Sequence, residues 1–235
     1  METYAGDIEA RRYALRQQKL MMGMSVIAGF CDSYGLLYFK TYVSFMSGNT
    51  TQTGFASGQH NLAAAGIALT AILFFMAGIF AAVTFTNGPW YRSGWMPFVL
   101  VAFLLAVSGF IPGDDAGAKY GGVAILSFAM GYFNNALSHV GRQTVNADFV
   151  TGNLSNSVQH IVFAIQNKPM ENPLGTWDTH KYRAVLLIGI WFCFLAGAFL
   201  CASLAGWLGK WVLVLPVLAL LLCPVYVRCY PQIIA

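Results

Sequence analysis

Long apolar runs recur along the chain and are separated by short polar segments. Because an α-helix needs about 20 mostly apolar residues to cross a hydrocarbon core, each run is a candidate membrane-spanning helix. The runs are Leu20–Phe39, Leu62–Thr86, Met96–Pro112, Gly121–Gly141, Ala184–Gly209 and Trp211–Val227. This pattern predicts an all-α membrane protein with about six transmembrane helices.

Three groups of residues in the first half of the chain recur in the same order in the second half. They pair Gly29–Asp32 with Gly131–Asn134, Phe45–Asn49 with Phe149–Asn153, and Phe75–Phe80 with Phe194–Phe199. Each half then holds three spans, and an odd number of crossings places the second copy upside down in the membrane. We therefore expect two inverted three-helix repeats, a frequent plan of secondary transporters.

The repeats divide one integral membrane domain. A cytoplasmic N-terminal segment is expected over residues 1–19, a first membrane repeat over residues 20–112 and a second over residues 121–228.

A polar segment follows the first span of each half. Residues 42–46 and 144–150 are rich in β-branched and aromatic types and are expected to be extended. A side chain at Ser47 or Asn49, and at Thr151 or Asn153, is expected to cap a short helix that follows. Non-helical backbone at membrane depth is tolerated only where protein buries it or a watery cavity solvates it, so both segments are expected to line a site. Full crossing by both segments, which would give eight spanning elements, stays an alternative.

The starts of these short helices are the candidate substrate site. A helix N-terminus carries free N–H groups and a partial positive charge, which suit anions and carboxylate or carbonyl oxygens. Glycines allow a ligand to approach closely, and hydroxyl and amide groups add neutral hydrogen bonds. The candidate substrate-binding residues are Ser47, Gly48, Asn49, Thr50, Thr51, Asn134, Asn135, Thr151, Gly152, Asn153 and Ser155. The alternative is that they belong to the ordinary ends of surface helices.

Two acidic residues are candidates for proton or ion coupling. Asp32 is the one charge in the first span, and an intramembrane carboxylate by default indicates an ion or proton site. Asp148 lies in the second polar segment. The alternatives are that Asp32 is a structural carboxylate bonded to backbone and that Asp148 pairs with Arg142.

Composition supports a membrane location and limits the function. The chain is 57% hydrophobic and only 9% charged, against about 25% charged in soluble domains. If the N-terminus is inside, only Lys40, Lys119 and Lys210 lie outside, so the positive-inside bias predicts that both termini are cytoplasmic. We find no nucleophile motif, phosphate loop or metal-ligand spacing, so neither an enzyme nor a bound cofactor or metal is expected.

The doubled motifs carry a resemblance to a known family. With Gly29 to Asp32, Ser47-Gly48-Asn49 and Thr151-Gly152-Asn153, the chain resembles the YoaK-like family of bacterial multi-pass inner-membrane proteins, a domain of unknown function. The resemblance extends from about Met24 to Val227, with Ser47 where Thr is expected. It implies a bacterial inner-membrane location and supplies no substrate.

The residues therefore favour a secondary transporter of a small polar or anionic organic solute, bound between two half-helix N-termini near the bilayer midplane, with proton coupling as a further expectation. A channel or facilitator of the same architecture and a non-transporting accessory subunit are the alternatives. The expected partners are the lipid bilayer and a small-molecule substrate, with homo-oligomers left open and no nucleic acid.

Overall fold

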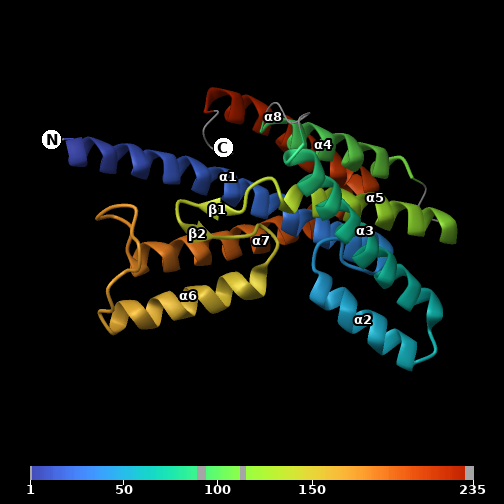
Figure 1. Ribbon diagram of the computed structural model, residues 1–235. Coiled ribbons are helices and arrows are strands. Elements are labelled where there is room, and N and C mark those ends of the chain that lie inside the picture. Colours follow the sequence, from blue (N-terminus) through green and yellow to red (C-terminus); the bar gives the residue numbers. More distant parts are fainter. Residues whose placement is uncertain (1, 89–93, 112–114, 231–235) are drawn as a thin grey trace.

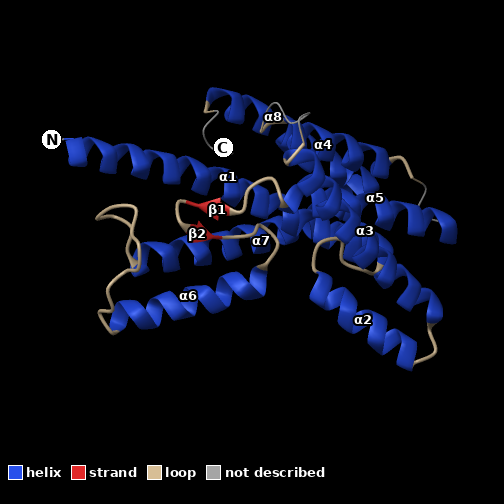
Figure 2. Cartoon of the chain, viewed as in Figure 1, coloured by secondary structure: helices blue, strands red, loops and turns tan. Residues whose placement is uncertain are grey.

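The computed structural model describes residues 2–88, 94–111 and 115–230, and these are almost entirely helical (Figures 1 and 2). The elements are α1 (Glu2–Phe39), α2 (Met46–Gly58), α3 (Leu62–Thr86), α4 (Met96–Gly109), α5 (Ala116–Asn134), β1 (His139–Val140), β2 (Gln143–Thr144), α6 (Val150–Ile165), α7 (His180–Leu208), the 3-10 helix η1 (Gly209–Leu213) and α8 (Val214–Cys229). Strands β1 and β2 form a small antiparallel hairpin.

Each predicted apolar run contains a helix, and α3 has the predicted bounds. Most of the other boundaries differ by a few residues, and two differ by more than five. Helix α1 begins at Glu2, so the N-terminal segment and the first span are one continuous helix. Helix α5 ends at Asn134 because the chain turns there towards the β1–β2 hairpin, whose turn contains Gly141 with φ +59°. The predicted end of the first repeat, residue 112, lies outside the described residues.

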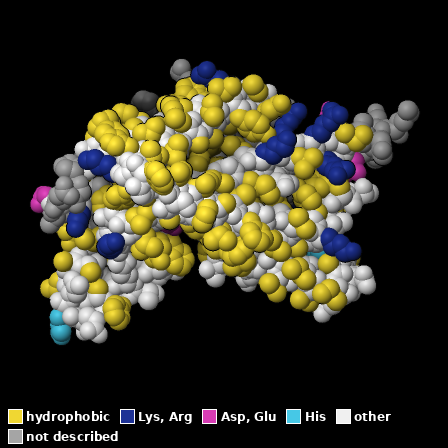
Figure 3. All heavy atoms as spheres, turned by 180° about the vertical axis from the view of Figure 1, so that it is seen from behind, with side chains coloured by type: hydrophobic (Ala, Val, Ile, Leu, Met, Phe, Trp, Pro, Cys, Tyr) yellow, Lys and Arg dark blue, Asp and Glu magenta, His cyan; other side chains and the backbone are white. Residues whose placement is uncertain are grey.

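Three stretches of the described chain are long and apolar enough to cross a membrane, namely Gly6–Phe39, Leu62–Thr86 and His180–Cys229, and α4 is a shorter apolar helix. Large apolar side chains are widely exposed, including Phe80 at 74% and Leu222 at 70%. Figure 3 shows hydrophobic side chains over much of the visible face. This surface is compatible with a membrane protein. The number of crossings and their inverted arrangement stay predictions.

Helices α1 and α7 pack against each other through two glycines. A Cβ atom on Gly29 of α1 would collide with the backbone carbonyl of Phe194, and one on Gly197 of α7 would collide with the carbonyl of Val26. The two backbones are therefore as close as backbone atoms permit. Small residues allow such contacts between helices in lipid, where association depends on close packing.

Helices α3 and α5 make a second contact of the same kind. A Cβ atom on Gly78 of α3 would collide with the Phe128 carbonyl, and one on Gly131 of α5 would collide with the Phe75 carbonyl. Contacts on either side of these crossings show the direction of the helices. Gln18 pairs with Tyr182 and Ser25 with Ile190 on α1 and α7, and Tyr120 pairs with Ala63 well before Gly131 meets Phe75 on α5 and α3. The residue numbers rise together, so the helices of each pair are parallel.

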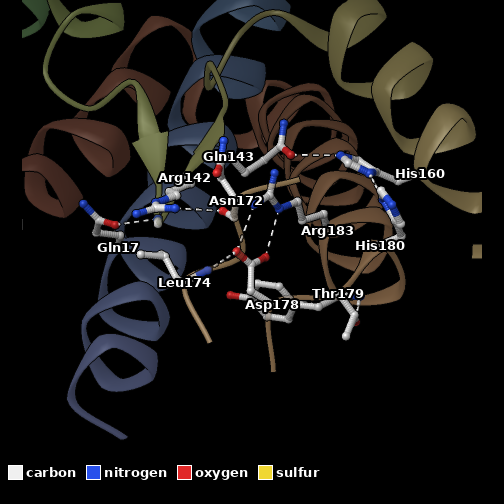
Figure 4. Close-up of polar contacts among 12 residues, drawn as sticks. Gln17, Arg142, Gln143, His160, Asn172, Leu174, Asp178, Thr179, His180 and Arg183 are labelled. Carbon is white, nitrogen blue, oxygen red and sulfur yellow. Dashed lines mark hydrogen bonds and ion pairs between the residues drawn. The ribbon is translucent and has the colours of Figure 1, made fainter. Parts of the chain in front are cut away.

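A polar cluster joins α7 to the loop before it (Figure 4). Arg183 donates from Nε and Nη2 to the two carboxylate oxygens of Asp178, both at 2.9 Å, and Asp178 also accepts from the Leu174 N–H at 3.0 Å. Burial alone would raise the pKa of Asp178, but the hydrogen bonds from Arg183 outweigh it, so this pKa lies below its ordinary value. The ion pair therefore stabilises the loop at neutral pH.

The same cluster continues to the hairpin and to α1 (Figure 4). The Nδ1 atoms of His160 and His180 lie 2.8 Å apart, and His160 Nε2 lies 3.0 Å from Gln143 Oε1. Gln17 of α1 accepts from the Gly141 N–H at 2.8 Å. These contacts connect α1, α6, α7 and the hairpin at one end of the molecule.

Substitution of Gly29 by Ala is expected to destabilise the protein, because the new methyl group meets a backbone carbonyl that cannot rotate away. Overpacking typically costs about 1–3 kcal/mol. The matched control is Gly206→Ala on α7, where a Cβ meets nothing within 4 Å. Thermal melting in detergent measures both, and equal melting temperatures for the two variants would contradict the close contact.

Substitution of Asp178 by Asn is expected to cost about 2 kcal/mol at neutral pH, because Arg183 loses a charged partner. A depressed carboxyl pKa stabilises the fold above the ordinary pKa, and this stabilisation is lost as the pH falls through the lowered value. The difference in melting temperature between wild type and variant should therefore shrink in acid. Glu171→Gln in the same loop, where the side chain is exposed, is the control and should show no such pH dependence.

Candidate functional site

The first half-helix, α2, is joined to α1 by a short non-helical segment, residues 40–45. Phe45 directly precedes α2, and its ring lies against Gly48, where a Cβ would collide with it. Asn49 is fully buried and reaches back to the segment. Its Nδ2 donates to the Tyr42 carbonyl at 2.8 Å and its Oδ1 accepts from the Tyr42 N–H at 3.1 Å. The segment is thus fixed to the first turn of the helix.

The second half-helix, α6, begins in the same way. Phe149 directly precedes it, and the ring lies against Gly152. The buried Asn153 donates from Nδ2 to the Asn146 carbonyl at 2.9 Å. The doubled Phe-x-x-Gly-Asn pattern therefore has a physical role: glycine leaves room for the ring, and asparagine satisfies the backbone of the preceding segment.

This geometry corrects the predicted caps. The helices begin at Met46 and Val150, which is earlier than a cap at any of the predicted residues allows, and no side chain caps either helix. The asparagine side chains turn backwards onto the preceding backbone instead. Both predicted extended segments are non-helical except for their last residues, Met46 and Val150, which already belong to α2 and α6.

The predicted substrate-binding residues fall into distinct environments. Ser47, Thr50, Thr51, Thr151 and Ser155 are exposed, whereas Asn49 and Asn153 are buried. The Thr50 and Thr51 hydroxyls donate to carbonyls of their own helix, at 2.8 and 3.2 Å. Asn134 and Asn135 lie at the end of α5, half-buried. The structure therefore does not gather these residues around one point.

Asp32 lies two turns before the end of α1 and is bonded to the segment before α2. One carboxylate oxygen accepts from the N–H groups of Val43 and Ser44, at 2.8 and 2.7 Å, and the other accepts from the Ser44 hydroxyl at 2.8 Å. The carboxylate is 3% exposed. These contacts have the form expected of a structural carboxylate, because charge-assisted hydrogen bonds to backbone stabilise its ionised state.

In the second half, the acidic residue lies in the segment before the half-helix and not in the first span. By the sequence alignment, Asn134 corresponds to Asp32 and Asp148 corresponds to Ser44. Asp148 is 7% exposed. Among the described residues, Asp148 Oδ2 and Asn134 Oδ1 are buried without a hydrogen-bond partner. Asp148 also lies close enough to Asp32 for the two carboxyl groups to repel each other.

The alternative that Asp148 pairs with Arg142 is not found in the described residues. Arg142 is exposed and donates from Nη1 to the Asn172 carbonyl at 3.0 Å (Figure 4). The hairpin carries Arg142 towards the loop before α7 and away from the α6 start.

A cavity of about 310 Å³ lies between the starts of the two half-helices. Its walls come from α1, the segment before α2, the first turn of α6, and α7. In Figure 1, α2 and α6 start near the centre of the molecule and run away from it in opposite directions, and Figure 3 shows a notch between the two lobes that carry them. Polar atoms come from Asp32, Ser33, Tyr42 and Thr151, and the rest of the lining is largely aromatic or aliphatic, as at Phe194.

A family model described as "Protein of unknown function (DUF1275)" matches residues 20–226. The chain belongs to the DUF1275 family. This agrees with the resemblance inferred from the doubled motifs, and the matched range runs from the middle of α1 into the last turn of α8. No curated protein and no solved structure matches the chain.

For this DUF1275 chain, sequence reasoning missed most of the cavity lining. Of the predicted substrate-binding residues, Thr151 is part of the lining, together with the coupling candidate Asp32. Tyr42, Phe45 and Phe194 were not predicted as site residues. A signal was present for two of them, because Phe45 and Phe194 belong to the repeated motifs.

Substitution of Asp32 by Asn is expected to cost about 2–3 kcal/mol, because an amide cannot accept all three hydrogen bonds of the carboxylate. Asp148→Asn is the comparison, since it replaces a buried carboxylate that has an unpartnered oxygen in the described structure. We expect that variant to melt at or above the wild-type temperature in detergent. A larger loss for Asp148→Asn than for Asp32→Asn would contradict the assignment of Asp32 as the structural carboxylate.

Proposed function

We propose that this chain is a multi-pass membrane protein that transports a small polar or anionic organic solute as a secondary transporter. The observation that carries the proposal is the cavity between the half-helix starts, whose walls come from both halves of the chain. A volume of about 310 Å³ lies at the lower end of the range for small-molecule sites and suits a small solute.

The proposed architecture is six crossings arranged as two inverted three-helix repeats. The two glycine contacts support it, because each joins the first span of one repeat to the third element of the other. Gly29 and Gly197 make the α1–α7 contact, and their sequence counterparts Gly131 and Gly78 make the α3–α5 contact. A two-fold relation between the halves accounts for both contacts at once.

The half-helix starts provide the proposed polarity of the site. The first turn of α6 contributes Val150 and Thr151 to the cavity wall, and a helix N-terminus favours negatively charged or carbonyl oxygens. The aromatic rings of Phe45 and Phe194 supply apolar contact for the organic part of the solute. A small carboxylate or a planar polar molecule fits this combination.

Asp148 is the proposed proton-coupling group. Asp32 accepts three hydrogen bonds, which favour its ionised form, and a second charge close to it in a buried place is unfavourable. Asp148 would therefore bind a proton in one state of the transport cycle and release it where water reaches the α6 start. Because α6 is bonded to the preceding segment through Asn153, a shift of Asp148 would move the wall of the cavity.

The proposed location is the bacterial inner membrane with both termini in the cytoplasm. The positive-inside bias supports this orientation. The start of α1 and the end of α8 lie towards the same side of the molecule in Figure 1, as an even number of crossings requires.

The test begins with a thermal-shift screen of inorganic anions, small carboxylates and nucleobases on the purified protein. Solutes that stabilise it are then assayed for uptake and counterflow in liposomes. Ala198→Trp fills the cavity and should abolish both stabilisation and uptake, whereas Ala196→Trp, at an exposed position on the same helix, should retain them. Equal uptake by the two variants would refute the cavity as the transport site.

Asp148→Asn tests the coupling. This variant should retain counterflow, because the cavity is intact, and should lose accumulation driven by an imposed pH gradient. Uptake without counterflow in the wild type would instead identify a channel or facilitator. Unchanged proton-driven accumulation in the variant would exclude Asp148 as the coupling group.

A further inference from the structure

A second cavity, of about 370 Å³, lies between α1 and α8, away from the proposed transport site. Its walls are almost entirely apolar. Leu20 and Ile27 of α1 face Ala219 and Leu222 of α8 across it. Leu222 is 70% exposed, so the groove is open on the side where apolar side chains face outwards.

The groove exists because α8 does not pack fully against α1. Helix α4 packs closely on α5, where the fully buried Phe98 meets Phe133 edge to face, with ring centroids 6.1 Å apart. Between α1 and α8 the corresponding space is left empty at Gly23. A Cβ on this glycine would meet nothing within 4 Å. The protein's own side chains therefore do not fill the groove.

One end of the groove carries a positive charge. Lys19 lies at this end and is exposed. Among the described residues, the ion pair found is the one between Asp178 and Arg183. Lys19 therefore forms no ion pair with a described carboxylate. From Lys19 to Ile27 the helix rises about 12 Å, which gives the groove a cationic end and a long apolar body.

Neighbouring contacts are of the kind typical of the depth of lipid headgroups. The Arg16 guanidinium lies 4.0 Å from the centre of the Tyr230 ring, and the Tyr226 hydroxyl donates to the Arg16 carbonyl at 3.3 Å. Tyrosine and tryptophan rings paired with cations concentrate at the boundary between headgroups and hydrocarbon. Lys19 follows Arg16 by one helical turn towards the hydrocarbon side.

We propose that this groove binds one anionic phospholipid, with its phosphate beside Lys19 and an acyl chain lying over Gly23 between α1 and α8. The charge at the mouth selects the headgroup, and the apolar walls take the chain. This site is separate from transport, and it requires only that the protein lies in a bilayer.

Native mass spectrometry of the detergent-purified protein, titrated with phosphatidylglycerol or phosphatidylcholine, tests the site. The wild type should retain phosphatidylglycerol preferentially. Lys19→Gln should weaken phosphatidylglycerol binding about fivefold and leave phosphatidylcholine binding unchanged. Lys181→Gln, at an exposed position at the start of α7, is the charge control and should leave both affinities unchanged.

Gly23→Leu tests the groove itself, because the new side chain fills open space and should displace either lipid. Gly206→Leu, also at a glycine with nothing within 4 Å, is its control. Ala219→Leu fills the groove from the opposite wall and replaces Gly23→Leu if that variant does not fold. Equal lipid binding by the groove and control variants, equal binding by the two lysine variants, or a protein dimer that the groove variants dissociate would overturn the proposal.

Discussion

Two stretches of this chain leave the helical conformation next to buried apolar helices, and the backbone groups released there need partners. Side chains supply them. Asp32 accepts two backbone N–H groups, and Asn49 both donates to and accepts from the backbone of Tyr42. An unsatisfied amide in an apolar layer costs several kcal/mol, so these few side chains make the interrupted helices possible. The cavity and the half-helix starts depend on them.

The two halves solve this problem differently. In the first, an acid on the helix bonds to the extended segment. In the second, the helix carries Asn134 and the segment carries Asp148, and both have a buried oxygen without a partner in the described structure. The acidic residue is thus fully hydrogen-bonded in the first half, whereas in the second half it has an oxygen without a partner.

The hydrophobic pattern predicted the helices well. The repeats singled out the Phe-x-x-Gly-Asn motifs but did not predict the contacts that these residues make. The ends of α3 followed from its uncharged run, whereas the continuation of α1 to Glu2 did not, because its first turns are polar and are stabilised by contacts far away in sequence. The Gly-Asn pairs were recognised as a motif, yet only coordinates reveal that the asparagines turn back onto the preceding segment. The repeated motif singled out Phe194, but its place in the cavity wall depends on how α7 lies against α1, which the motif does not show.

The glycine contacts have a mechanical consequence. Where Gly29 and Gly197 lie against opposing carbonyls, the contact consists of backbone atoms instead of interlocked side chains. Interdigitated side chains must repack before two helices can change their crossing angle. A backbone contact imposes no such step. At this point α1 and α7 can therefore change their crossing angle while the two backbones stay in contact.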